Sequence, residues 1–197
     1  MSDQTESNEA ESSHELQEDL RYELDQMDQV VRELESLEED VSGRSPTLRE
    51  QAAASSFLAS FYTGVENILK RILRYHDREV PRSERWHVEL FEQFTPVGRQ
   101  SDGAGSGGAD PSGVDPGGAE SKASREGKAP EDELPVLFPG ELIDEMDAYR
   151  RFRHIAHHGY ERDLDYERMQ AGIEGARSAF EKFRSRVIEY LNDRVPG

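Results

Sequence analysis

Apolar residues recur every three or four positions along four long segments of this chain, and this spacing constrains the fold more than any other feature. It places the apolar side chains on one face of an α-helix. No segment of useful length alternates apolar and polar residues, as a half-buried strand would. We therefore expect an all-α protein, an antiparallel bundle of four main helices with one short additional helix.

Capping residues and composition set the expected bounds of the first three helices. Residues 1–13 are acidic and polar, so we expect a disordered tail there. A first helix then runs over residues 14–41. Ser45-Pro46 suits the N-cap and first position of a second helix that ends near His76. A short third helix is expected over residues 86–94.

A segment rich in Gly, Pro and Ser, residues 96–133, has almost nothing to bury. We expect it to be a disordered insertion within a single domain. The two parts of that domain are residues 14–95, which hold the first three helices, and residues 134–197.

The second part of the domain holds the last two helices. The fourth opens at Pro139, and Gly159 is a suitable terminator. A fifth helix can be capped by Asp163 or Asp165 and ends before Pro196.

Composition excludes several classes of protein. The chain has 197 residues and no cysteine, so disulfide frameworks and thiolate metal sites are excluded. It has no apolar run of about 18 residues, and its acidic N-terminus is the reverse of a signal peptide. We expect a soluble cytoplasmic protein without a membrane segment.

The formal net charge of −18 is unevenly distributed, and one segment opposes it. The first 42 residues carry most of the acidic excess. Between Tyr149 and Arg162, by contrast, four arginines face a single acid, Glu161. A basic segment on an acidic chain is informative, because the overall field would otherwise repel phosphate.

The basic segment contains three histidines, and three interpretations of it are open. The arginines can be an ordinary solvated face beside core residues. His154, His157 and His158 have the spacing of metal ligands on one helix face, but no HExxH motif is present and the nearby arginines oppose a dication. The third interpretation is phosphate chemistry on RNA.

Two residues of this segment can together cleave RNA without a metal. Arg153 can hold a phosphodiester bidentately and stabilise the charge that develops on it. His158 can deprotonate a 2′-hydroxyl or protonate the leaving 5′-oxygen, which gives a 2′,3′-cyclic phosphate. Arg150, His154 and His157 are candidates for supporting contacts to phosphate.

Positions 153 and 158 are poorly placed to meet on one helix. Five residues rotate by about 500° around an ideal helix, which leaves the two positions roughly 140° apart. Either the helix opens near Gly159, or two subunits combine their motifs across a two-fold axis.

The residues from Arg153 to Tyr160 fit the pattern R-x4-H-x-Y, which resembles the signature of HEPN-domain ribonucleases and specifically of the HepT toxins. Four flanking segments are similar to the family's second and third helices and to the surroundings of its motif: residues 57–72, 85–91, 149–154 and 163–169. The resemblance covers residues 14–95 and 134–193.

The resemblance implies a metal-independent endoribonuclease that acts as a homodimer, with no cofactor and an RNA substrate, for which tRNA is one candidate. HepT toxins belong to type VII toxin–antitoxin systems. Their partner, a MNT-type minimal nucleotidyltransferase antitoxin, transfers AMP from ATP to the motif tyrosine, here Tyr160. His154 departs from the family, which usually has Asn at this position.

Two alternatives to the nuclease stay open. One is a catalytically inactive HEPN-like binding or regulatory module, which the acidic charge and His154 favour. The other is a helical adaptor that dimerises through its first two helices.

Overall fold

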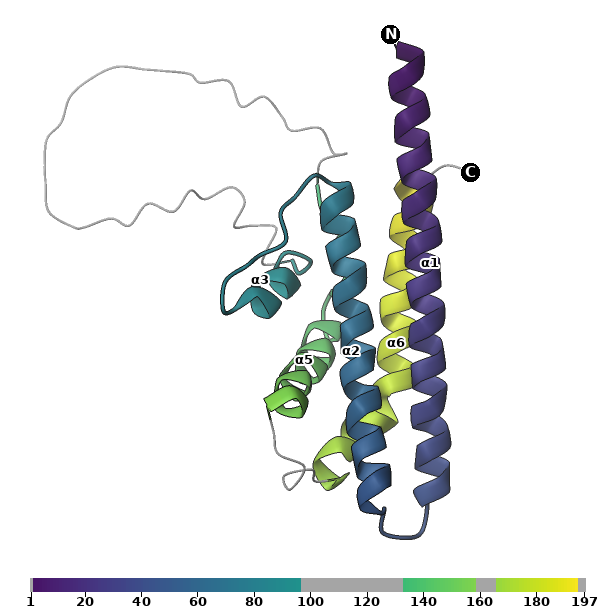
Figure 1. The fold of residues 1–197 in the computed structure, drawn as a ribbon, viewed down its shortest axis with the longest axis vertical. Coiled ribbons are helices and arrows are strands. Elements are labelled where there is room, and N and C mark those ends of the chain that lie inside the picture. Colours follow the sequence, from purple (N-terminus) through teal and green to yellow (C-terminus); the bar gives the residue numbers. More distant parts are fainter. Residues whose placement is uncertain (1, 97–132, 159–165, 195–197) are drawn as a thin grey trace, which may run out of the picture.

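The computed structural model describes residues 2–96, 133–158 and 166–194, and within them it holds five α-helices and no strand (Figure 1). The helices are α1 (Ser2–Val41), α2 (Leu48–Tyr75), α3 (Trp86–Glu92), α5 (Leu142–His158) and α6 (Tyr166–Arg194). The predicted all-α bundle of four main helices and one short helix is confirmed.

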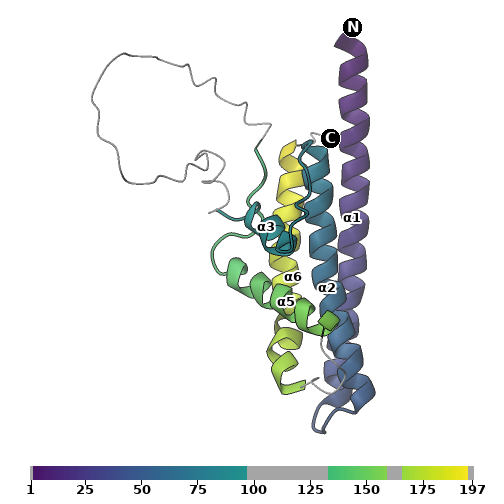
Figure 2. The same ribbon diagram turned by 60° about the vertical axis from the view of Figure 1, so that its left-hand side comes forward.

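The three longest helices lie side by side along the length of the molecule (Figures 1 and 2). α1 runs antiparallel to α2, and α6 runs in the same direction as α2. The shorter α5 packs against both α2 and α6, and α3 packs against α2. This arrangement leaves α3 and α5 on the side of α2 that faces away from α1 (Figure 1).

The apolar faces predicted from the spacing form one continuous core. On α1 the buried residues include Leu20, Leu24, Met27, Val31 and Leu34. Comparable rows on α2 and α6 are buried against them, and α5 adds its first turns.

Gly64 of α2 allows a close approach to α1. A Cβ atom at this position would overlap Met27 Cγ, so a larger residue would push the two helices apart. Glycine is therefore used here for its small size, because the helix itself would be better served by alanine.

α1 begins at Ser2, earlier than the predicted start at residue 14. The acidic, polar residues between Ser2 and residue 14 have few apolar side chains to bury. Extending a helix that has already formed, however, fixes only one residue for each new hydrogen bond. The helix therefore propagates through a segment whose composition resembles a disordered tail.

The predicted start of α2 at Ser45-Pro46 is wrong, because the N-cap is Thr47. The Glu50 backbone N–H donates to Thr47 Oγ1, and the Thr47 backbone N–H donates to Glu50 Oε2 at 2.7 Å, which together form a capping box. Arg44 adds two hydrogen bonds to the same carboxylate. The Arg44 bonds, followed by those from Thr47, lower the pKa of Glu50 to about 2.

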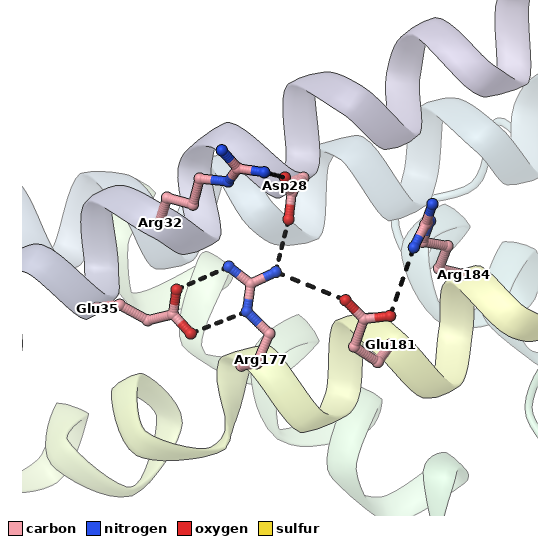
Figure 3. Close-up of polar contacts among 6 residues, drawn as sticks. All are labelled: Asp28, Arg32, Glu35, Arg177, Glu181 and Arg184. Carbon is pink, nitrogen blue, oxygen red and sulfur yellow. Dashed lines mark hydrogen bonds and ion pairs between the residues drawn. The ribbon is translucent and has the colours of Figure 1, made fainter.

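Arg177 of α6 ties α1 to α6 through ion pairs (Figure 3). Its Nε and Nη2 donate to the two carboxylate oxygens of Glu35 at 2.8 and 2.7 Å, and its Nη1 donates to Asp28 at 2.5 Å. These hydrogen bonds lower the pKa of both carboxyls and raise that of Arg177. The pairs fix the register of the two helices at a partly exposed seam.

Residues 133–138 return the chain to the bundle before α5. The backbone N–H groups of Leu137 and Phe138 both donate to the Phe94 carbonyl, and the Phe138 ring stacks between Phe91 and Phe183. Most of the predicted insertion, residues 97–132, lies outside the described residues.

The remaining helix bounds differ from prediction by a few residues. α3 ends at Glu92, and α5 starts at Leu142 rather than at Pro139. Gly159, Asp163 and Asp165 lie outside the described residues. None of the described helices combines the length and the apolarity needed to cross a bilayer.

Candidate active site

Arg153, the arginine of the R-x4-H-x-Y motif, lies on the side of α5 that packs against α2. Its side chain is 17% exposed, and its Nη1 donates to Glu66 Oε1 at 2.9 Å. Glu66 comes from the middle of α2 and is 1% exposed. The motif arginine is therefore held by a fully buried carboxylate of the same chain.

Glu66 lies within the apolar face of α2. It follows Tyr62 by four positions and precedes Leu69 by three, and both of these residues are buried. A buried carboxylate is costly unless cations or hydrogen-bond donors compensate it. The partners that Glu66 collects are therefore required by the fold, whatever else they do.

His87, in the first turn of α3, is the second partner of Glu66. Its Nδ1 lies 2.6 Å from Glu66 Oε1 and 2.9 Å from Arg153 Nη1. The guanidinium can only donate, so the consistent arrangement has both nitrogens donating to the same carboxylate oxygen. In this arrangement Nδ1 of His87 carries a proton.

The protonation state of His87 follows from its surroundings. Burial, together with the nearby cations Arg153 and Lys70, lowers the pKa of His87, and the Glu66 carboxylate opposes this effect. At neutral pH the ring is thus neutral with its proton on Nδ1, which leaves a lone pair on Nε2. The ring is 31% exposed, so it is not sealed from solvent.

Lys70 and Trp86 complete the cluster. Lys70 Nζ lies 3.8 Å from Glu66 Oε2 and 4.5 Å from the centre of the Trp86 ring, and its own pKa is lowered by burial. The Trp86 and His87 rings are in contact, with centroids 3.5 Å apart. Arg153 Cζ is 5.9 Å from the same indole.

The charges of this cluster leave it weakly positive. Arg153 and Lys70 contribute two cations, Glu66 one anion, and His87 is neutral, so one positive charge remains. Among the described residues, Arg153 Nε is buried without a hydrogen-bond partner, and so is Glu66 Oε2. The cluster therefore keeps one buried donor and one buried acceptor without a hydrogen bond, together with one net positive charge.

Arg150, predicted to give a supporting phosphate contact, is paired with Asp147 within its own helix. Its Nε donates to Asp147 Oδ1 at 2.7 Å, and Arg151 binds the other oxygen of that carboxylate at 2.5 Å. Arg150 and Arg151 thus share one carboxylate, and of the three arginines of the basic segment that the structure describes, Arg153 is the one directed at the Glu66 cluster.

For the other predicted site residues the structure describes either the backbone alone or nothing. α5 is helical through His158, so positions 153 and 158 keep the angular separation expected from an ideal helix. The side chains of His154, His157 and His158 lie outside the described part of the chain, and Tyr160 lies outside it entirely.

The two residues that contact Arg153 Nη1, Glu66 and His87, were missed by sequence reasoning. Glu66 gave a usable signal, since it is a lone acid on the apolar stripe formed by Tyr62, Leu69 and Leu73. His87 gave none, because nothing in the sequence around it marks it as a partner of a residue in α2. Its contact with Glu66 depends on the folded chain.

A helical bundle that carries the motif arginine and histidine on one helix, α5, is the architecture that the resemblance to HEPN-domain proteins predicts. A family model described as HepT-like protein matches residues 53–101 and 124–193, which is more than half of the chain. The chain therefore belongs to the HepT-like family and is a HEPN-type, toxin-like protein. No curated protein and no solved structure matches it.

Proposed function

We propose that this protein is the toxin of a type VII toxin–antitoxin pair, a metal-independent endoribonuclease. The supporting observation is the position of Arg153, which lies in a partly buried side-chain cluster with one net positive charge on an otherwise acidic protein. Arg153 binds the scissile phosphate and stabilises the charge that develops on it, and His158 performs acid–base chemistry. The products are a 2′,3′-cyclic phosphate and a free 5′-hydroxyl.

The active form is a homodimer. α5 is continuous between Arg153 and His158, so the two positions differ by roughly 140° around its axis. A two-fold axis resolves this separation by bringing the arginine of one protomer near the histidine of its partner. Arg150, His154 and His157 then border the same cleft and contact the RNA backbone.

The antitoxin is a MNT-type nucleotidyltransferase that modifies Tyr160. It transfers AMP from ATP to the phenol oxygen and releases pyrophosphate. A bulky anion at position 160 would occupy and neutralise a phosphate site built around Arg153. No metal or cofactor belongs to the toxin itself.

Cleavage of RNA by the purified protein tests this function. Wild type is compared with Arg153→Ala and His158→Ala, and the cyclic phosphate end is detected on the product. We expect each variant to lose about 10²–10³-fold in rate. Arg151→Ala, which removes an exposed arginine of the same helix, is the matched control and should cleave normally.

A second candidate is a binding or regulatory module without nuclease activity. The observation that favours it is the ion pair itself, since Glu66 neutralises the motif arginine within the chain. Equal behaviour of wild type and His158→Ala on RNA, combined with binding to the nucleotidyltransferase, would support the module. Intact mass after co-expression reveals AMP on Tyr160 in either case.

A further inference from the structure

The geometry points to His87 as a second catalytic histidine: we propose that its Nε2 is the general base that takes the proton from the RNA 2′-hydroxyl at the phosphate bound by Arg153. This inference rests on the proposed function and deepens it. It assigns His87 to proton abstraction and leaves His158 to protonate the leaving group.

The first argument is proximity within one protomer. Among the side chains that the structure describes, His87 is the imidazole that contacts the Arg153 guanidinium, at 2.9 Å, and both groups share one carboxylate oxygen. Position 158 is on the same helix as Arg153 but roughly 140° away around its axis. A phosphate that binds Arg153 therefore meets the ring of His87 from the same chain.

The second argument is orientation. The bond from Nδ1–H to Glu66 fixes both the tautomer and the plane of the ring, and Glu66 is itself fully buried in the core. Contact with the Trp86 ring holds the imidazole from one face. A neutral imidazole oriented in this way by a carboxylate presents its Nε2 lone pair as a base, and the carboxylate stabilises the imidazolium that forms.

The third argument is the charge around the ring. Glu66 and Lys70 face His87 from α2, and Arg153 faces it from α5. The two cations disfavour a second proton on the ring in its resting state, as a base requires. Because the pKa of His87 lies below its ordinary value, the base form is populated at neutral pH.

The step balances without a further reactant. The 2′-oxygen attacks phosphorus as its proton passes to Nε2 of His87, and the bond from phosphorus to the 5′-oxygen breaks. The 5′-oxygen takes a proton from the imidazolium of His158. One proton is gained by His87 and one is lost by His158, so exchange with water restores the enzyme.

The test uses the full-length protein, with His87→Asn as the central variant. An asparagine amide can still donate to Glu66 in place of Nδ1, so the fold keeps its partner for the buried carboxylate while Nε2 is lost. His76→Asn is the matched control, since His76 is a part-buried histidine at the end of α2 that bonds Tyr190. Circular dichroism checks that each variant is folded.

Three measurements discriminate the role. We expect His87→Asn to cleave about 10²–10⁴-fold more slowly than wild type and to lose the fall in rate on the acidic side of the pH profile. His76→Asn should match wild type. An RNA with sulfur in place of the scissile 5′-oxygen needs no leaving-group protonation, so it should rescue His158→Ala and leave His87→Asn slow.

The outcomes distinguish a failure of the role assigned to His87 from a failure of the proposed nuclease function. If His87→Asn cleaves at the wild-type rate with an unchanged pH profile, or if the sulfur substrate rescues it, His87 is not the base, although the nuclease stands. If wild type cleaves no RNA, the proposed function fails and the inference fails with it.

Discussion

Replacing Arg153 by methionine should destabilise the fold, because it leaves Glu66 buried without its main cation. Removing one partner of a buried ion pair costs about 3–5 kcal/mol. Glu66 is 1% exposed, but His87 remains at 2.6 Å and Lys70 at 3.8 Å to compensate part of the charge. We therefore expect a loss near the lower limit, about 3 kcal/mol, which corresponds to about 6–12 °C in melting temperature for a domain of this size.

A double-mutant cycle separates the interaction energy of the Glu66–Arg153 pair from the effects of losing each side chain alone. Glu66→Gln removes the buried charge but retains an acceptor for His87. In this background Arg153→Met should therefore lower the free energy of unfolding by less. We expect the double variant to be more stable than the sum of the two single effects by about 2 kcal/mol. Urea unfolding, followed by circular dichroism, gives the free energy of unfolding of the four proteins in the cycle: wild type, the two single variants and the double variant.

The matched control for this cycle is Arg151→Met. Arg151 is two positions away on the same helix, has the same charge and is 74% exposed, so its loss should change the unfolding free energy by no more than about 0.5 kcal/mol. The reasoning is refuted if Arg153→Met is as mild as Arg151→Met, or if the Glu66 and Arg153 effects are additive within about 0.5 kcal/mol.

Three further predictions test the bundle by unfolding measurements. Gly64→Ala should destabilise by about 1 kcal/mol, because overlap with Met27 outweighs the better helix propensity; a more stable variant would contradict the close approach. Thr47→Ala should cost about 1 kcal/mol through loss of the N-cap, whereas Ser45→Ala should be neutral. The two α1 carboxyls that Arg177 binds have lowered pKa values, so their contribution is present above the unfolded pKa and disappears as the pH falls through the folded one. Arg177→Met should therefore flatten the loss of stability in acid, and an unchanged pH dependence would argue against the pairs.

The apolar spacing predicted the core of this protein well, because burial on a helix depends on local periodicity. The apolar stripes that this spacing places on α1, α2 and α6 are buried. The start of α2 was missed because two capping signals compete within three residues. Ser45-Pro46 has the better local preference, but Thr47 has Glu50 at the position that closes a capping box.

Only part of the candidate site, Arg153, could be predicted from the sequence, and the physical reason differs from that for the helix start. Arg153 belongs to a short motif that can be recognised by its spacing. Glu66 and His87 are 21 positions apart and lie in separate helices, and they meet Arg153 only because α3 and α5 pack on the same side of α2. No local pattern encodes that contact, although an acid on an apolar stripe signals that some buried partner must exist.

Glu66 has two effects on the site that act in opposite directions. By binding Arg153 and His87 it holds a cation and a base within 3 Å of one another, a spacing that Arg153 and the imidazolium formed on proton uptake would resist without an anion between them. By contributing a negative charge it also lowers the net charge of the cluster to one positive unit. A pocket with two uncompensated cations would bind the substrate and the cyclic phosphate product alike, and binding that is uniform does not speed the chemical step. The carboxylate therefore favours orientation over raw attraction to phosphate, which is what the proposed cleavage needs and what a simple anion-binding surface would not need.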